Sequence, residues 1–190
     1  MIKEALTYIA DDLDTFLKRK YVTSERSVKL GSILNQDGSV PEENRNKIII
    51  SVINLEHEST IPNAIHGKQF KNHFDQVNPP LCFNVNVMVA ALFNNYEESL
   101  KFISGALYYF QAKSHFDGQN SPGLDPEIFQ LSAEVMKLNS TESFNLWSSM
   151  GTKYIPSVPF KIRMITFQGD QTERNIPNVT AVKEHVQADV

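Results

Sequence analysis

The sequence has little of what secreted, membrane-spanning and metal-dependent proteins usually need. Its 190 residues include one cysteine, Cys82, so neither an internal disulfide nor a cluster of thiolate ligands can form. The first residues do not show a basic segment followed by an apolar one, so we expect no export signal and folding in the reducing cytosol. No apolar stretch approaches the roughly 20 residues that cross a bilayer, and we expect a soluble chain without direct membrane insertion.

The sequence also lacks the motifs of nucleotide chemistry and acyl transfer. Its 8 glycines are scattered, without a G-x-x-x-x-G-K, G-x-G-x-x-G or G-x-S-x-G spacing. Cys82 lies in an apolar alternating segment, where a thiol is usually inert packing. Lys and Arg total 18 against 22 Asp and Glu, and the net charge of −4 disfavours binding to phosphate backbones. We therefore expect no enzyme, no cofactor and no nucleic-acid partner.

What is present is enough apolar surface for a core, with 41% hydrophobic residues and 12 Phe. Apolar spacing of three and four predicts helices over about 2–18, 96–112 and 140–150, the second presenting one stripe of Leu100, Ile103, Leu107 and Phe110. Alternation or β-branched content predicts strands over about 28–32, 47–55, 81–91 and 158–164. Residues 128–138 fit neither period cleanly, and a strand is favoured there over a short helix. The first two strands could form a hairpin around Asp37-Gly38. The expected fold is α+β, with a mixed or antiparallel sheet of about four main strands packed with amphipathic helices.

The pattern dissolves in two places, which sets the expected organisation. Residues 57–79 are polar and end in Pro-Pro, which is typical of a long loop, although a poorly patterned edge strand is an alternative. From residue 169 onward the chain is polar and nearly aperiodic. We expect one domain over 1–168, with a long loop at about 57–79, followed by a polar tail over 169–190.

Three histidines of the loop stand near carboxylates and are the best candidates for metal chemistry. They are His57, His66 and His73, beside Glu56, Glu58 and Asp75. No pair has the four-apart helical spacing of zinc motifs, so solvated loop histidines are the favoured interpretation over a small metal-dependent hydrolase. The acidic run Asp11, Asp12 and Asp14 is interpreted as the polar face of the opening helix, with Lys18 four residues beyond Asp14.

Three cations lie around an aromatic residue near the last strand. Lys153, Lys161 and Arg163 flank Tyr154, and the residue types fit a phosphate-binding strip, a salt contact with another protein or a solvated strand face. The residues alone leave these three readings open. They lead to an α+β domain without an assembled active site, whose function must reside in its surfaces.

Several segments, taken in order, resemble one known family. They are Asn78-Pro-Pro-Leu with the strand to Leu92, Tyr96-Glu-Glu-Ser-Leu-Lys-Phe, Gln119-Asn-Ser-Pro-Gly-Leu, and Gly151-Thr-Lys-Tyr-Ile-Pro-Ser-Val followed by Lys161-Ile-Arg-Met. With the opening helix, they make residues 1–168 similar to the tube-terminator, or cap, proteins of phage-tail-like contractile injection systems of the antifeeding-prophage type.

The resemblance implies a structural role. A cap of this kind forms a hexameric ring on the end of the inner tube that is distal to the baseplate, ends tube and sheath growth and joins the two. The implied partners are further copies of the chain, the inner-tube protein and the sheath protein, in a particle assembled in the cytoplasm that can be released. A baseplate or spike adaptor of the same particle is the alternative.

The interface residues expected on this basis fall into two groups. Lys153, Lys161 and Arg163, with Tyr154, are expected to pair with carboxylates of the tube or sheath. His66 and Lys68 in the loop, and Ile176 and Val179 in the tail, are expected to provide adaptable contacts because these segments are polar and weakly patterned.

Overall fold

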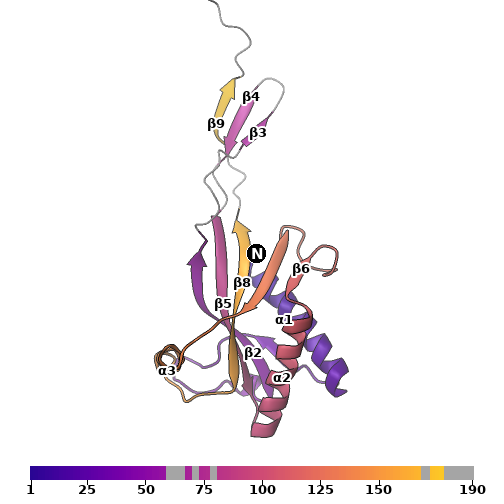
Figure 1. The fold of residues 1–190 in the computed structure, drawn as a ribbon, viewed down its shortest axis with the longest axis vertical. Coiled ribbons are helices and arrows are strands. Elements are labelled where there is room, and N and C mark those ends of the chain that lie inside the picture. Colours follow the sequence, from indigo (N-terminus) through magenta and orange to yellow (C-terminus); the bar gives the residue numbers. More distant parts are fainter. Residues whose placement is uncertain (59–66, 70–72, 78–80, 168–171, 178–190) are drawn as a thin grey trace, which may run out of the picture. The chain divides into compact units, whose positions relative to one another are not determined.

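The computed structural model describes residues 1–58, 67–69, 73–77, 81–167 and 172–177 (Figure 1). The chain divides into two compact units. The first contains Met1–Glu58 and Cys82–Thr166, and the second contains Ser59–Leu81 and Phe167–Val190. Each unit has its own sheet, of six and of three strands respectively.

The first unit is an α+β fold built on a mixed sheet, as predicted. Its strands run in the order β1-β2-β5-β8-β7-β6, with β1 parallel to β2 and the pairs β2–β5, β6–β7 and β7–β8 antiparallel. Five of the six strands fall in segments predicted as strands, β1 among them with three residues, and the sixth, β6, also of three residues, was not predicted. The elements are α1 (Ile2–Tyr21), β1 (Val28–Leu30), the 3-10 turn η1 (Glu42–Asn44), β2 (Lys47–His57), β5 (Leu81–Leu92), α2 (Tyr96–Ala112), β6 (His115–Asp117), β7 (Gln130–Val135), α3 (Ser140–Ser149) and β8 (Ser157–Phe167).

Helices cover both faces of this sheet, with α1 and α2 on one side and α3 on the other (Figure 1). Alternate residues of the central strand β5 therefore meet different partners. Met88 and Ala90 pack with Ile49 and with Trp147 of α3, while Val87 and Val89 point to the opposite face. A strand that is buried on both faces reads as a nearly continuous apolar run.

The expected hairpin between the first two strands is wrong, because β1 and β2 are parallel, with Val28 opposite Ile48 and Leu30 opposite Ile50. The predicted turn does form: Gly38 has a φ of 80°, and its N–H donates to the Asn35 carbonyl at 3.0 Å. It belongs to a crossover through η1 that brings the chain back to the starting end of β1. A turn signal fixes a local reversal but not the strand that follows.

The buried face of α2 matches the expected stripe in part. Leu100 and Leu107 are 43% and 39% exposed, whereas the other two members of the stripe, Ile103 and Phe110, are buried together with Phe102, Ala106 and Tyr109. The reason lies at Gly105, where a Cβ atom would come within 2.6 Å of Leu17 Cδ2 and 2.8 Å of Tyr21 Oη. The close approach of α1 at this glycine turns the neighbouring residues of α2 inward and leaves the leucine stripe outside.

Asp14 of α1 is buried, which corrects its assignment to a polar helix face. Its Oδ1 accepts hydrogen bonds from the backbone N–H groups of Ser27 at 2.6 Å and Val28 at 3.0 Å, and its Oδ2 pairs with Lys18 Nζ at 2.8 Å. The carboxylate thereby fixes the start of β1 against α1. The predicted Lys18 partner is confirmed.

The second unit places strands where the sequence predicted a loop and a tail. Its antiparallel sheet has the order β3-β4-β9, with β3 at Gly67–Gln69, β4 at His73–Val77 and β9 at Thr172–Pro177. Phe74 of β4 lies opposite Ile176 of β9. Strands of three to six residues give too few repeats for a period of two to stand out, and the paired strands β4 and β9 are about a hundred positions apart.

Replacing the buried carboxylate should cost more than replacing an exposed one on the same helix. We expect Asp14→Ala to lower the free energy of unfolding by about 2–3 kcal/mol, because two buried N–H groups lose a charged acceptor. Asp11→Ala removes a pair with Arg26 in which both side chains are 55% exposed, and should cost less than about 1 kcal/mol. Urea unfolding of both variants measures the difference, and equal losses would contradict the proposed role of Asp14.

Candidate assembly surface

Polar side chains gather on the face of the six-stranded sheet that packs against α3. They lie in the part of that face that α3 does not cover. The register places Glu56 opposite Asn84, and Glu134 opposite Lys161. Lys161 Nζ donates to Glu56 Oε2 at 2.7 Å, and Asn86 Nδ2 donates to Glu56 Oε1 at 2.6 Å. One carboxylate thus joins three strands, β2, β5 and β8, through charge-assisted hydrogen bonds.

The same contacts set the protonation of Glu56. The hydrogen bond from Lys161, and next the one from Asn86, lower the pKa of the Glu56 carboxyl below its ordinary value. Asn86 is 2% exposed, and its Oδ1 atom is buried without a hydrogen-bond partner. The Asn86 side chain is therefore held through its Nδ2 group, which donates to Glu56.

Two of the three cations predicted to bind partner carboxylates are already paired within the chain. Lys161 is bound to Glu56, and Arg163 Nε lies 3.2 Å from Glu134 Oε2 on the neighbouring strand β7. Lys153 is exposed, and no ion pair involving it occurs in the part of the chain that the structure describes. Lys153 lies in the loop before β8, so the three cations do not share one strand edge.

Tyr154 stands at the rim of an apolar groove. It is 64% exposed and rests edge-on against the buried Trp147 of α3, with ring centroids 5.8 Å apart. The groove has a volume of about 570 Å³, and Tyr96, also 64% exposed, lines it from the start of α2. Its floor includes Leu92, Phe93, Ile155 and Pro156. Exposed tyrosines around an apolar hollow are typical of protein-binding surfaces.

Sequence reasoning missed the outer stripe of α2. Tyr96, Leu100 and Leu107 are spaced by four and seven residues, lie on one line along the helix and are all exposed. The sequence did contain an indication of this stripe. The segment of α2 has apolar residues on more than one side, and a helix with a single buried face needs them on one side only.

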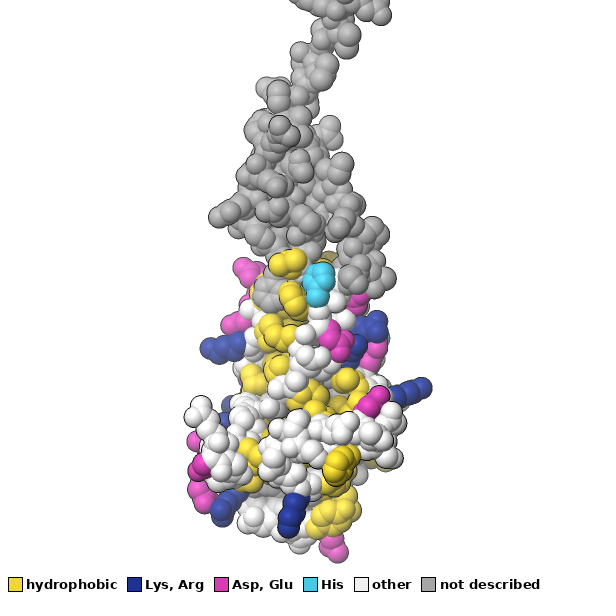
Figure 2. All heavy atoms as spheres, turned by 90° about the vertical axis from the view of Figure 1, so that its left-hand side faces the viewer, with side chains coloured by type: hydrophobic (Ala, Val, Ile, Leu, Met, Phe, Trp, Pro, Cys, Tyr) yellow, Lys and Arg dark blue, Asp and Glu magenta, His cyan; other side chains and the backbone are white. Residues whose placement is uncertain are grey.

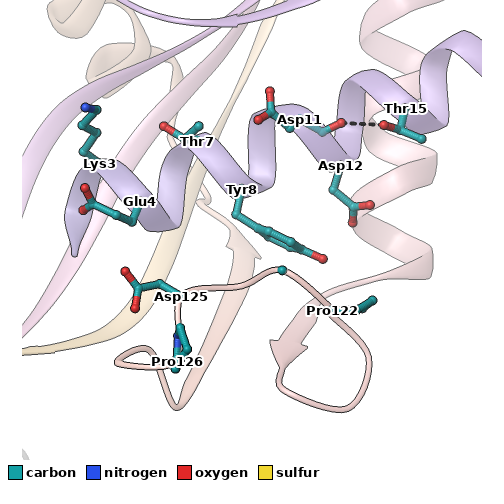
Figure 3. A pocket seen from close by; sticks show the side chains of 11 residues that line it. Lys3, Glu4, Thr7, Tyr8, Asp11, Asp12, Thr15, Pro122, Asp125 and Pro126 are labelled. Carbon is teal, nitrogen blue, oxygen red and sulfur yellow. Dashed lines mark hydrogen bonds between the residues drawn. The ribbon is translucent and has the colours of Figure 1, made fainter.

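A larger groove of about 740 Å³ lies between α1 and the turn at 122–126 (Figure 3). Its rim carries Glu4, Asp11, Asp12 and Asp125. Asp12 Oδ2 accepts hydrogen bonds from Tyr109 Oη at 2.8 Å and Lys113 Nζ at 2.7 Å. Burial, followed by the contact with Asp12, raises the pKa of Tyr109 far above its usual range, so the phenol remains a donor. Asp12 therefore ties α1 to Tyr109 of α2 and to Lys113 at its end.

The remaining predicted contacts fall in the second unit or outside the described residues. Lys68 belongs to β3 and Ile176 to β9. His66 and Val179 lie outside the described residues.

The described residues do not assemble a metal site. No group of three His, Cys, Asp or Glu side chains among them could hold a metal ion. His57 ends β2 and packs edge-on against Phe83, with ring centroids 5.6 Å apart, and Cys82 is 3% exposed. His66 of the candidate set lies outside the described residues. Within the part of the chain that is described, no helix has the length and apolarity to span a membrane.

The fold is shared with two solved structures of low sequence identity. Over the whole chain it is similar to the sheath/tube terminator of an extracellular contractile injection system, PVC, in its extended state, with a TM-score of 0.66 and 11% identity. It is also similar, over 92% of the chain, to the tube-terminating cap of the anti-feeding prophage, with a TM-score of 0.57 and 11% identity. The chain spans 64% and 60% of the lengths of these two structures. No curated protein matches the sequence.

The sequence gives the family directly. Residues 7–181 match the model of the Pvc16 N-terminal domain, so this chain belongs to that family. The match confirms the resemblance to tube-terminator proteins and extends past residue 168, through strand β9.

Removing the ammonium group at residue 161 should release Glu56. We expect Lys161→Met to raise the pKa of Glu56 toward its ordinary value of 4.5, whereas Lys153→Met should leave it unchanged. A lowered folded-state pKa stabilises the fold above the unfolded pKa, and this stabilisation is lost as the pH falls through the folded value. Carbon-13 NMR titration of the carboxyl measures the shift. Because Glu56 is 37% exposed, the stability change should stay below about 1 kcal/mol, and an unmoved pKa would refute the pairing.

Proposed function

We propose that this chain is a cap that ends the inner tube of a contractile injection system and joins the tube to its sheath. The observation that carries the proposal is the shared fold: the similarity to the PVC sheath/tube terminator extends over the whole of this chain, and the family match covers residues 7–181. A cap needs complementary surfaces rather than a reaction centre. The grooves and exposed aromatic residues described above fit that requirement.

Ring formation explains how such a chain would stop a growing tube. Head-to-tail contacts close into a ring when the rotation per subunit divides a full turn. One face of the ring can match the last tube layer, while the opposite face does not offer the surface that the next layer needs. We propose a hexameric ring at the end distal to the baseplate, assembled in the cytoplasm as part of a particle that can be released.

The contacts that we propose for tube and sheath come from both units. In the first unit they include Tyr154, Lys153, Lys161 and Arg163, the last two through exchange of their internal carboxylate partners. In the second they include His66, Lys68, Ile176 and Val179, within the segments 57–79 and 169–190. We infer that the role is structural and uses neither a catalyst nor a cofactor.

Removing the gene and examining the particles tests the function. We expect tubes of uncontrolled length with detached sheath, seen by electron microscopy, and full rescue by the intact gene. The labelled protein should appear at the end opposite the baseplate, whereas label at the baseplate would favour an adaptor. Tubes of unchanged length that retain their sheath would refute the cap. Repeating the rescue without residues 169–190 tests the contribution of that segment.

Charge reversal at Lys153 isolates the contact with partners from internal pairing. We expect Lys153→Glu to reduce particle assembly severalfold without changing the unfolding midpoint, because no ion pair within the described residues is broken. Arg19→Glu, at an exposed cation of α1, is the matched control and should assemble normally. Counting capped particles by electron microscopy gives the comparison, and equal assembly of both variants would exclude Lys153 from the interface.

A further inference from the structure

The first unit leaves one side of β2 open. Strand β1 pairs with Ile48–Ile50 only, and β2 continues through Ser51–His57 without a strand opposite that side in the part of the chain that the structure describes. Ile48 N–H donates to the Ser27 carbonyl at 2.7 Å, and the Ile50 carbonyl accepts from Gly31 N–H at 3.0 Å. Backbone groups of the even-numbered residues therefore point toward this side, and Val52 is the next of them.

The open edge is apolar. Val52 and Leu55 are 42% and 49% exposed, and the bulge between Val52 and Asn54 places both on one face, opposite Val87 and Val85. The view onto this side of the molecule shows hydrophobic side chains along its middle, with charged groups at the margins (Figure 2).

A groove runs along the same edge. Its volume is about 430 Å³. Residues 51–53 of β2 form one wall, residues 32–36 after β1 form a second, and Leu146 of α3 with the C-cap residue Met150 form a third. An added strand could therefore hydrogen-bond to the β2 backbone and place an apolar side chain in the groove, which is how strand addition obtains affinity and specificity.

Native sheets usually protect such an edge with lysine, proline or a covering element. Residues 51–55, Ser-Val-Ile-Asn-Leu, contain neither lysine nor proline, and Glu56 is turned to Lys161. Among the described residues, two features protect part of this stretch of β2: the bulge, and the segment after β1, whose residues 32–36 line the groove beside residues 51–53. A seven-residue edge extends over about 23 Å, which is comparable to the width of a standard interface of about 800 Å² per partner.

The opposite end of the sheet is also incompletely covered. Strand β6 pairs with Gln130–Ser132 of β7, so the end of β7 extends beyond it. Val135 there is 56% exposed, and Phe129, just before β7, is 90% exposed. The β2 and β6–β7 edges lie at opposite ends of the strand order.

We propose that the β2 edge (51–57) receives the β6–β7 edge of a second copy of this chain, so that the sheets of neighbouring subunits join head to tail. A closed ring requires two different surfaces on each copy that complement one another. The sheet provides two incompletely paired edges at its opposite ends, each with two exposed apolar side chains, Val52 and Leu55 at one and Phe129 and Val135 at the other. The inference rests on the proposed ring and assigns its subunit contact.

Variants at the two edges test the contact. Val52→Lys and Val135→Lys should each shift the protein from rings to monomers, measured by light scattering and electron microscopy, while circular dichroism reports a folded chain. Val22→Lys, at a side chain that is 92% exposed at the end of α1, is the matched control and should form rings. The Val52 amide should exchange its hydrogen at least tenfold more slowly in wild-type rings than in the Val135→Lys monomer.

Mixing single-cysteine variants, each made in a Cys82→Ser background, tests the direction of the contact. Oxidation of a mixture with cysteine at residue 52 or 55 in one chain and at 129 or 135 in the other should give disulfide-linked heterodimers, and neither variant alone should dimerise. Symmetric dimers of the Val52→Cys variant would overturn the head-to-tail arrangement. Rings that keep a rapidly exchanging Val52 amide, or a Val52→Lys variant that loses tube binding but not rings, would overturn the edge assignment and leave the cap intact. A wild-type chain that stays monomeric, both alone and with tube protein, would refute the edge assignment and the proposed cap together.

Discussion

The fold depends on the burial of β5 on both of its faces. All of its residues from Asn84 to Leu92 are buried, including the two asparagines Asn84 and Asn86. A strand of this kind needs a neighbouring strand on each side and a covering helix on each face. If one face were exposed, several apolar side chains would contact water, and the loss of burial would cost about 25 cal/mol per Å² of apolar surface. The positions of α3 on one face and of α1 and α2 on the other follow from this constraint.

The two asparagines show where the constraint changes. At Met88 and Ala90 the face is closed by Trp147, but at Asn84 and Asn86 it is closed by hydrogen bonds to Glu58 and Glu56. The polar half of the sheet is thus held together by side-chain bonds between strands, and the apolar half by packing. An unsatisfied buried amide costs about 1–3 kcal/mol, so the network around Glu56 contributes to the alignment of β2, β5 and β8 as well as to the charge of the surface.

Patterns that repeat over many residues were predictable from the sequence, and features that depend on the partner of a segment were not. The eleven-residue alternation from Leu81 identified β5, and the amphipathic spacing identified α1 and α2. The direction of β1, the rotation of α2 around Gly105 and the burial of Asp14 each depend on an element distant in sequence. Short strands such as β3 and β6 were missed for a related reason, because their stability comes from a neighbouring strand rather than from their own three residues.

The candidate surface was predictable only in its residue types. Tyr154 is exposed as expected, but the carboxylates that neutralise Lys161 and Arg163 come from β2 and β7, and no spacing along the chain reveals them. These internal pairs have a functional consequence for a ring. A cation that already has a carboxylate must exchange it to bind a partner, and the exchange is nearly neutral when both pairs are exposed. Affinity between subunits would then come from the apolar edges and grooves, while the charged pairs would fix orientation and exclude incorrect partners. A terminator must bind one face of a tube and not another. For that selectivity, charged pairs that exclude incorrect partners contribute more than further apolar contacts that only raise affinity.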